Sequence, residues 1–403
     1  MISCTFTFGK WGDAAKSGDS QDEAEIEQQI VEIAEDLEME GLAKEIEDLG
    51  GQNIQMLKRA VSFEGDLKTL YRTNLELRTS IRILKPIYSF QAQDENEFYD
   101  KIKELDWSQY MSNSDTLAVD ATTFGEYFTH SKYISLKAKD AIVDQFRDNT
   151  GRRPNVNVIS PTIRISIHIQ IDEVIVSLDS SGDPLFKRGY RVERMGAPMN
   201  EVLAAGMILL SAWDKKSDFM DGMCGSGTLP IEAGLIARNM PSQWNRTSFG
   251  FQTWKDFNND IWQEVRAEAK AKIIPFEHNI SGYDRDFKAI SVARVNIMKA
   301  GLDDTINVKR TTFEKLEASS EKGIMILNPP YNERLAIKNI NELYKMMGDQ
   351  FKQQFKGWEV WVISSNMRAL KSIGLRPSKK IHLMNGPLDC KYVKFEMYDG
   401  TRR

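Results

Sequence analysis

The sequence predicts an α/β protein in which an open, mostly parallel sheet with a terminal antiparallel hairpin follows a smaller α+β region. Strands and helices alternate from about residue 200 onward, whereas the preceding elements are short and mixed. Alternation of this kind favours parallel strands, which need a crossover helix between them. Glycine-rich or polar segments follow three of the strands, and such sheets bind ligands at the carboxyl ends of their strands. We therefore expect a ligand site in the C-terminal half.

The region before residue 180 is expected to contain short elements of both kinds. Residues 12–25 are rich in Gly, Ser, Asp and Glu and are expected to be disordered, and 24–48 carry apolar residues at helical spacing. The strand pattern is clearest at 162–170, where apolar and polar residues alternate. The predicted elements, in order, are a hairpin at 54–63, a helix at 67–78, a strand at 80–90, a helix at 95–110, a strand at 115–121, a helix at 132–148, and strands at 162–170 and 173–178.

The C-terminal half is expected to alternate between the two kinds of element. The apolar run 323–328 is short and unbroken, as in a strand buried on both faces. The predicted order is helix 199–213, strand 217–222, helix 227–240, strand 279–284, helix 286–300, strands 305–309 and 323–328, helix 338–355, strand 358–364 and a hairpin within 380–398.

Composition excludes several classes of protein. No apolar run approaches the ~20 residues of a membrane span, and no basic-then-apolar signal sequence opens the chain. The three cysteines are widely spaced, so we expect no disulfide framework and no metal, and a cytoplasmic location. Residues 1–50 hold 3 basic and 14 acidic side chains, a net charge of −11, so the rest of the chain has a net charge of +6. A mildly basic body is compatible with RNA binding.

A glycine-rich turn follows the first predicted parallel strand. It runs from Asp221 to Thr228 and opens a helix, so backbone N–H groups would face a ligand there. Asp284 ends the next strand, where a carboxylate can accept hydrogen bonds from both hydroxyls of a ribose. A plain tight turn and a helix-capping acid are the alternatives, and Asp286 is the better candidate for the cap.

The residues Asn328, Pro329, Pro330 and Tyr331 follow the fourth parallel strand. The Asn side-chain oxygen and the Pro329 carbonyl can both accept hydrogens from a planar amino group, and the Tyr331 ring can stack on a flipped base. An S-adenosylmethionine site fits this set better than a dinucleotide site, because no third glycine follows in the spacing that a pyrophosphate requires. The pattern predicts methyl transfer to a nitrogen and leaves DNA, RNA and protein targets open.

The segments "DGMCGSGTLPIEAGLIA", "GYDRDFKAISVARVNIMKAG" and "NPPYNERL" resemble THUMP-containing class I RNA methyltransferases, most of all the guanine-N2 methyltransferases of ribosomal large-subunit (23S) RNA. The resemblance covers roughly 42–398. It implies a partial ferredoxin-like subdomain at 41–70, a THUMP RNA-binding domain at 71–185 and a Rossmann-like methyltransferase domain at 190–398. Residues 1–40 match nothing in the family, so we expect an acidic leader, disordered or helical, in place of the usual opening strand.

The resemblance also implies roles for individual residues. Asn328 to Tyr331 would hold the target amine and Asp284 the ribose, and a position usually occupied by an acid, here Thr312, would contact the adenine, with Glu314 as its alternative. The other cofactor-binding candidates are Asp221, Met223, Gly225, Ser226, Gly227 and Thr228. The RNA-binding candidates are Arg152, Arg153, Lys187, Arg188 and Arg191.

Three other functions remain open at this point. The same four-residue motif serves methylation of adenine amines and of protein glutamine amides. A ribosome-assembly protein that binds RNA with little turnover is a different class, favoured by Thr312 and by the unusual N-terminus. A nicotinamide enzyme is the third alternative.

Overall fold

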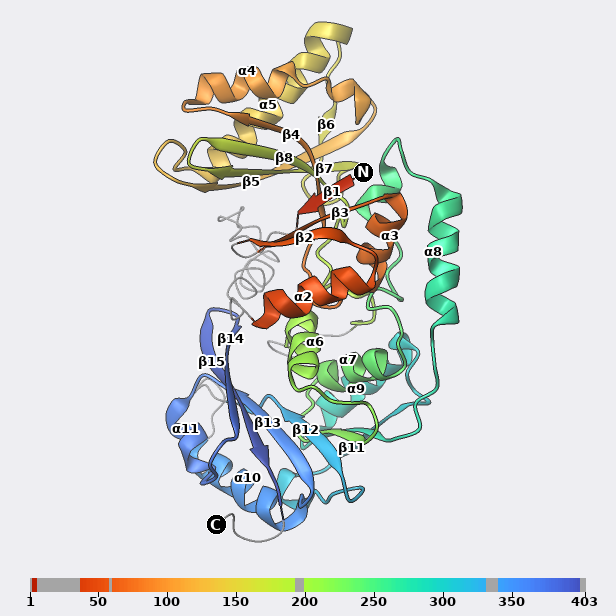
Figure 1. The fold of residues 1–403 in the computed structure, drawn as a ribbon, viewed down its shortest axis with the longest axis vertical. Coiled ribbons are helices and arrows are strands. Elements are labelled where there is room, and N and C mark those ends of the chain that lie inside the picture. The colour runs from red at the N-terminus through yellow and green to blue at the C-terminus, as the bar shows by residue number, and fades with distance from the viewer. Residues whose placement is uncertain (1, 6–36, 58–59, 193–198, 331–339, 399–403) are drawn as a thin grey trace. The chain divides into compact units, whose positions relative to one another are not determined.

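The computed structural model describes residues 2–5, 37–57, 60–192, 199–330 and 340–398 (Figure 1). The chain forms two compact units. Of the described residues, the first contains 2–5, Leu42–Leu185 and, from later in the sequence, Thr247–Ala267; the second contains 37–41, Phe186–Arg246 and 268–398.

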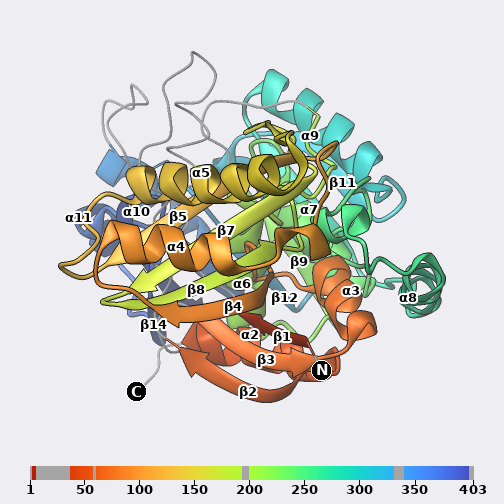
Figure 2. The ribbon, with the colours of Figure 1, turned by 90° about the horizontal axis from the view of Figure 1, so that it is seen from above.

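An eight-stranded sheet lies at the centre of the first unit, with strand order β2-β3-β1-β4-β8-β7-β5-β6. Its strands are β1 (Ile2–Thr5), β2 (Gln52–Leu57), β3 (Ala60–Gly65), β4 (Leu84–Gln91), β5 (Thr116–Phe124), β6 (Asn155–Val156), β7 (Ile163–Gln170) and β8 (Glu173–Asp179). The helices of this unit include α3 (Leu67–Glu76), α4 (Glu95–Glu104) and α5 (Ser131–Thr150), which follow the predicted order. Helices α4 and α5 lie side by side over one face of the sheet (Figures 1 and 2).

The opening strand that we expected to be lost or replaced is present. Strand β1 pairs antiparallel with β3 over its whole length, and its last residue, Thr5, pairs with Leu84 of β4. It joins the hairpin β2–β3 to the rest of the sheet. In the rest of the predicted leader, residues 6–36 lie outside the described residues, and residues 37–40 begin helix α2 (Leu37–Asp48). A four-residue strand is too short for a periodicity signal, so sequence pattern alone missed it.

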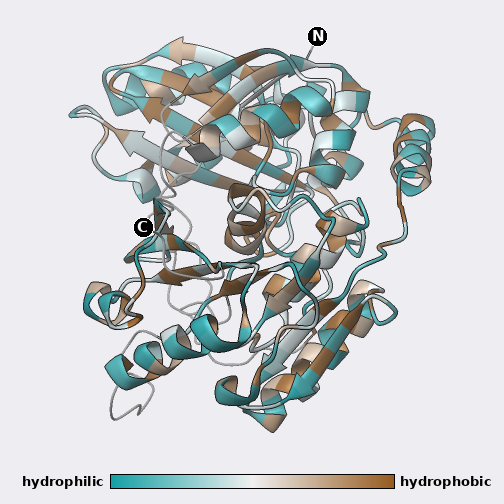
Figure 3. Cartoon of the chain, turned by 60° about the horizontal axis from the view of Figure 1, so that its bottom comes forward, coloured by the Kyte–Doolittle hydropathy of each residue, from teal (hydrophilic) through white to brown (hydrophobic). Residues whose placement is uncertain are grey.

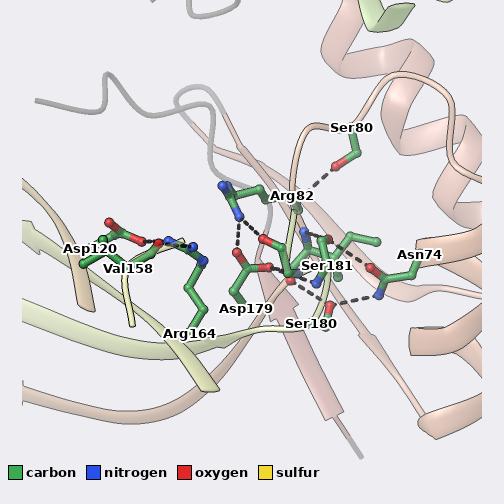
Figure 4. Close-up of polar contacts among 11 residues, drawn as sticks. Asn74, Ser80, Arg82, Asp120, Val158, Arg164, Asp179, Ser180 and Ser181 are labelled. Atoms are coloured by element: carbon green, nitrogen blue, oxygen red, sulfur yellow. Dashed lines mark hydrogen bonds and ion pairs between the residues drawn. The ribbon is translucent and has the colours of Figure 1, made fainter. Parts of the chain in front are cut away.

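A buried polar network joins α3 to the ends of β4 and β8 (Figure 4). Asn74 donates to the Ser180 hydroxyl and accepts from the Ser181 hydroxyl, both at 2.9 Å. The Arg82 guanidinium pairs with the Asp179 carboxylate and donates to the Gly182 carbonyl at 2.7 Å. Buried polar groups are costly unless they are hydrogen-bonded, so these partners fix α3 relative to the two strands.

The segment 247–267 supplies part of the first unit's core, which the sequence did not predict. Phe251 is fully buried and stacks on Tyr71 with ring centroids 4.4 Å apart. Trp262, from helix α8 (Asn259–Ala271), meets both rings edge-on at 5.3 and 6.1 Å. Aromatic pairs in these geometries are favourable beyond the area they bury. The first unit is therefore built from three separated stretches of chain: the N-terminal strand, Leu42–Leu185 and Thr247–Ala267.

The second unit contains a seven-stranded sheet of order β11-β10-β9-β12-β13-β15-β14, in which β9 to β13 are parallel and β15 runs antiparallel to its neighbours. This confirms the predicted fold class, including the terminal antiparallel hairpin. Its strands are β9 (Asp218–Asp221), β10 (Ile280–Asp284), β11 (Ile306–Arg310), β12 (Gly323–Leu327), β13 (Trp358–Ser364), β14 (Lys379–Asn385) and β15 (Leu388–Glu396). Its helices include α6 (Glu201–Leu210), α7 (Thr228–Ala237), α9 (Phe287–Ala300), α10 (Ile340–Gln354) and α11 (Met367–Ser372).

Both faces of this sheet are buried. Along β12, Ile324 and Ile326 belong to one hydrophobic cluster, whereas Met325 and Leu327 belong to another. Adjacent strand residues point to opposite faces, so an unbroken apolar run fills a core on each side. Apolar residues accordingly colour the strands, and polar residues gather on the outer helices (Figure 3). Two packed faces leave the strand ends as the place for a ligand.

Candidate active site

Three of the predicted site segments meet at one edge of the second unit's sheet. Strand β9 lies between β10 and β12, and all three are parallel, so their carboxyl ends share that edge. These ends carry Asp221, Asp284 and Asn328 respectively. The strand order reverses between β9 and β12, which is the position where open α/β sheets bind their ligands.

The turn after β9 needs glycine at two positions. Gly225 has φ +52° and Gly227, the residue before α7, has φ +86°, both in the left-handed region that glycine enters without steric cost. The backbone N–H of Gly225 donates to the Asp284 carboxylate at 3.1 Å, and that of Cys224 donates to the Tyr283 carbonyl at 2.8 Å. The turn is therefore held against the end of β10, with the N-terminus of α7 beside it.

Asp221 is a buried acid at this turn. Its side chain is 2% exposed, and one carboxylate oxygen accepts from the Met223 N–H at 3.0 Å. Burial raises the pKa of the Asp221 carboxyl to about 8, although the Met223 bond lowers it, and the nearby Asp284 charge adds to the rise. A cationic ligand group would restore the ionised carboxylate. The ammonium of a methionine moiety is a group of this kind.

The acid that caps α9 is Asp286 and not Asp284, as predicted. Asp286 caps α9 by accepting from the Lys288 N–H at 2.8 Å. Asp284 is half-buried, and its two oxygens accept from the Gly225 and Asp286 N–H groups at 3.1 and 2.8 Å. Each oxygen has a second lone pair, so the carboxylate can still accept from a ligand's hydroxyls.

Asn328 presents an unpaired acceptor. Its side-chain oxygen is buried and has no hydrogen-bond donor within the described part of the chain. A buried acceptor without a hydrogen bond costs about 1–3 kcal/mol, and a ligand that donates a hydrogen there would recover this free energy. Pro329 is buried and Pro330 half-buried after it. Tyr331 lies outside the described residues.

Thr312 lies at the end of β11, next to this edge. The Thr311 N–H donates to the Asp284 carbonyl at 3.0 Å, which holds the segment beside the end of β10. Thr312 precedes a short helix (Phe313–Lys315) and makes no side-chain capping bond. Both Thr312 and Glu314 are exposed. Their contact with an adenine stays a prediction.

Two of the RNA-binding candidates lie elsewhere than expected. The Arg188 side chain is buried, with its Nε atom 3.5 Å from the Glu232 carboxylate, which also accepts from the Tyr190 hydroxyl at 2.9 Å. Arg191 is 12% exposed and binds Ser226 and Thr228, two of the cofactor-binding candidates. This corrects their interpretation as surface contacts: the two arginines are held by acids of α6 and α7 that a count of local charge does not reveal.

The remaining candidates lie where their predicted roles permit contact. Arg152 and Arg153 are exposed in the first unit, whereas Lys187 and Met223 are half-buried in the second.

Asn296 was not predicted as a site residue, although its signal is visible in the sequence. It lies on the apolar face of α9, is fully buried, and donates to the Ser226 carbonyl at 3.1 Å. A polar residue on a buried helical stripe marks a side chain with a partner.

No helix in the described part of the chain is both long enough and apolar enough to cross a bilayer. No group of three or more His, Cys, Asp or Glu side chains in that part of the chain is arranged to hold a metal ion.

The sheet order, the glycine turn and the polar strand ends define a class I methyltransferase fold, and comparison with known families agrees. Residues 188–394 match the RMKL-like methyltransferase domain, 92–179 the THUMP domain and 39–84 the RlmL ferredoxin-like domain. The first match covers half of the chain, so the chain belongs to the RMKL-like methyltransferase domain family.

Individual relatives extend this result. A protein named ribosomal RNA large subunit methyltransferase K/L from Syntrophotalea carbinolica is 36% identical over 88% of this chain and 52% of its own length. The chain thus spans about half of that relative. A candidate RNA methyltransferase from Synechocystis is 35% identical over 88% of this chain and 93% of its own length. The solved structure of SMU.472, a candidate methyltransferase complexed with SAH, is 28% identical with a TM-score of 0.82 over 99% of both chains.

Proposed function

We propose that this protein transfers a methyl group from S-adenosylmethionine to the exocyclic amine of a guanine in RNA, in 23S ribosomal RNA. The observation that carries the proposal is the buried, unpaired side-chain oxygen of Asn328 at the carboxyl end of β12. It lies at the same edge of the sheet as Asp221 and Asp284, which have the chemistry to hold the methyl donor. The names of the relatives support ribosomal RNA as the target, and a cytoplasmic location goes with that substrate.

The cofactor would bind across the ends of β9 and β10. Asp284 would accept hydrogen bonds from the ribose hydroxyls, and Asp221 would face the methionine end, where the ammonium offsets the cost of a buried carboxylate. The backbone of the turn from Met223 to Gly227 would lie against the same ligand. Thr312 or Glu314 would contact the adenine. S-adenosylmethionine supplies the reactive methyl group when it is bound.

The chain's own contribution to the reaction is placement of the amine. A guanine turned out of the RNA would stack on Tyr331, and its amine would donate to the Asn328 oxygen and the Pro329 carbonyl. These bonds aim the nitrogen lone pair at the methyl carbon. The N–C bond would form as the donor's S–C bond breaks, sulfur would keep the electron pair, and the methylated nitrogen would lose its proton to water. Positioning can supply much of the rate, so no strong base is required.

The RNA would also contact a loop of the first unit. Arg152 and Arg153 are exposed, and the adjoining Val158 and Ile159 are 66% and 86% exposed. The loop is braced rather than loose. Arg164 pairs with Asp120 at 2.6 Å and donates to the Val158 carbonyl at 3.0 Å (Figure 4). A braced surface with two cations and apolar tips suits contact with phosphates and unstacked bases. Lys187 is a further candidate in the second unit.

The test combines cells and purified protein. Nucleosides of ribosomal RNA from cells with and without the gene are compared by mass spectrometry, and loss of one N2-methylguanosine is expected. Loss of a methyladenosine would change the substrate, and no change would contradict RNA methylation.

Asn328→Ala provides the second arm. It should lower turnover by about a hundredfold or more, as for loss of a preorganised transition-state contact, while the calorimetric affinity for S-adenosylmethionine stays within about threefold. Turnover near that of the wild type would remove Asn328 from the mechanism. Absence of any binding heat in the wild-type protein would favour an RNA-binding protein without turnover.

A further inference from the structure

The segment Arg188–Val192 crosses the second unit without forming a helix or strand, yet it contacts three helices. Arg188 and Tyr190 reach Glu232 of α7, and the Val192 N–H donates to the Asn296 side chain of α9 at 3.0 Å. Gly189 between them has φ +89° and its backbone lies close to the chain at Asn245. We call this segment the strap. Its path is fixed on both sides of Arg191.

The Arg191 guanidinium donates four hydrogen bonds to groups around the strap. Its Nε atom donates to Glu201 of α6 at 2.8 Å, and one Nη2 hydrogen bond goes to the Met199 carbonyl at 3.1 Å. The other donors reach the turn after β9. Nη1 donates to the Ser226 hydroxyl at 3.1 Å, and Nη2 donates to the Thr228 hydroxyl at 2.9 Å. A guanidinium has its donors in a rigid plane, so this set of bonds fixes the four acceptors relative to one another.

The turn has little stiffness of its own. Gly225 and Gly227, which flank Ser226, have positive φ, and glycine has more conformations to lose on ordering than any other residue. Ser226 and Thr228 are 6% and 4% exposed, and their hydroxyls face Arg191. Asn296 holds the Ser226 carbonyl from the side of α9. Arg191 and Asn296 thus both hold the turn, and its Gly225 N–H donates to Asp284.

We propose that Arg191 is a positioning residue that holds the glycine turn in its cofactor-binding conformation, so that the strap sets the affinity for S-adenosylmethionine. The proposal rests on the proposed function for the identity of the cofactor. Arg191 itself would not touch S-adenosylmethionine and would act only through the turn. Ser226 and Thr228 would contribute to the cofactor site through their backbone, because their side chains are engaged with Arg191.

Arg191→Lys tests this, since a lysine keeps the charge but cannot reproduce the planar set of bonds. Arg238→Lys is a matched control in the same unit. That arginine pairs with Asp304 at 3.0 Å and donates to Thr305 at 3.1 Å, and it lies at the opposite end of α7 from the turn. Loss of two bonds from a charged donor should raise the Kd for S-adenosylmethionine by about tenfold or more. Turnover at saturating cofactor should change by less than about threefold, because a uniform loss of binding raises KM alone.

Hydrogen exchange of the ligand-free proteins separates positioning from a general loss of stability. In Arg191→Lys the amides of Gly225 and Gly227 should exchange faster, while those of β13 keep their wild-type rates. Unchanged exchange at the turn together with unchanged affinity would overturn the proposal. Equal acceleration at the turn and in β13 would also overturn it, because the residue would then be merely structural.

Two further points keep the test decisive. If Arg191→Lys does not fold, Thr228→Val removes one acceptor with little change in shape, and the same exchange and affinity measurements apply to it. If the wild-type protein binds no S-adenosylmethionine, the proposed function fails, but exchange at the turn in the ligand-free variants still reports on Arg191.

Discussion

Replacement of Asp221 by Asn should change how the stability of the protein depends on pH. The pKa of the Asp221 carboxyl is raised by burial from 3.8 to about 8 in the folded protein, so between these pH values the native state keeps a proton that the unfolded chain releases. Stability should therefore fall as pH rises through this window, by at most about 1.4 kcal/mol per pH unit, and level off above it. Over the whole window the loss of stability adds up to about 6 kcal/mol. Asp221→Asn keeps the acceptor for Met223 and does not ionise, so it should lack this loss.

The assay is native-state hydrogen exchange of amides in β9 and α7, measured at several pH values from 5 to 9 in the wild type and in Asp221→Asn. The difference in opening free energy between the two proteins should change with pH in favour of the variant, and stop changing near pH 8. A difference that stays constant across this range would refute the assignment of a raised pKa to Asp221. Under the proposed function, saturating SAH should flatten the dependence in the wild type, because the ligand's ammonium stabilises the carboxylate.

Three other outcomes are expected. Phe251→Ala should destabilise the first unit by about 3–5 kcal/mol in exchange measurements, as for other buried aromatic truncations, whereas Phe287→Ala, at a residue that is 69% exposed, should have almost no effect. In calorimetry, Asp284→Ala should weaken S-adenosylmethionine binding by about a hundredfold or more, because bonds to a charged acceptor are lost. Its control, Asp286→Ala, removes the cap of α9 and should leave this affinity unchanged while lowering the free energy of unfolding by about 1 kcal/mol. Replacing Arg152 and Arg153 together by Gln should reduce the slope of log affinity for RNA against log salt concentration by about two, the contribution of two phosphate contacts. An unchanged slope would exclude both arginines as phosphate contacts.

The sequence predicted the second unit well because its signals are local and repeated. The run before Asn328 is apolar throughout, as a strand buried on both faces must be, and the glycines at 225 and 227 do occupy left-handed conformations. Parallel strands place their carboxyl ends at one edge, and the observed strand order then brings the three polar ends onto adjacent strands. Chemistry that depends only on strand ends is readable from sequence.

What the sequence did not reveal depends on contacts between distant positions. Arg191 reads as part of a basic surface cluster until Glu201 and Thr228 are seen beside it. Strand β1 is too short to show a period, and its place between β3 and β4 is a matter of long-range pairing. The segment around Phe251 lies within the sequence of one unit and packs in the other. Local patterns carry no record of such partners.

The origin of Phe251 and Trp262 has a consequence for synthesis on the ribosome. The main stretch of the first unit ends at Leu185, but its aromatic core is completed by residues up to Ala267, about eighty residues later. At 5–20 residues per second this is a delay of about 4–16 s. Until Phe251 is made, Tyr71 lacks the ring that stacks on it in the folded unit, and the nascent chain exposes the apolar surface that the later segment covers.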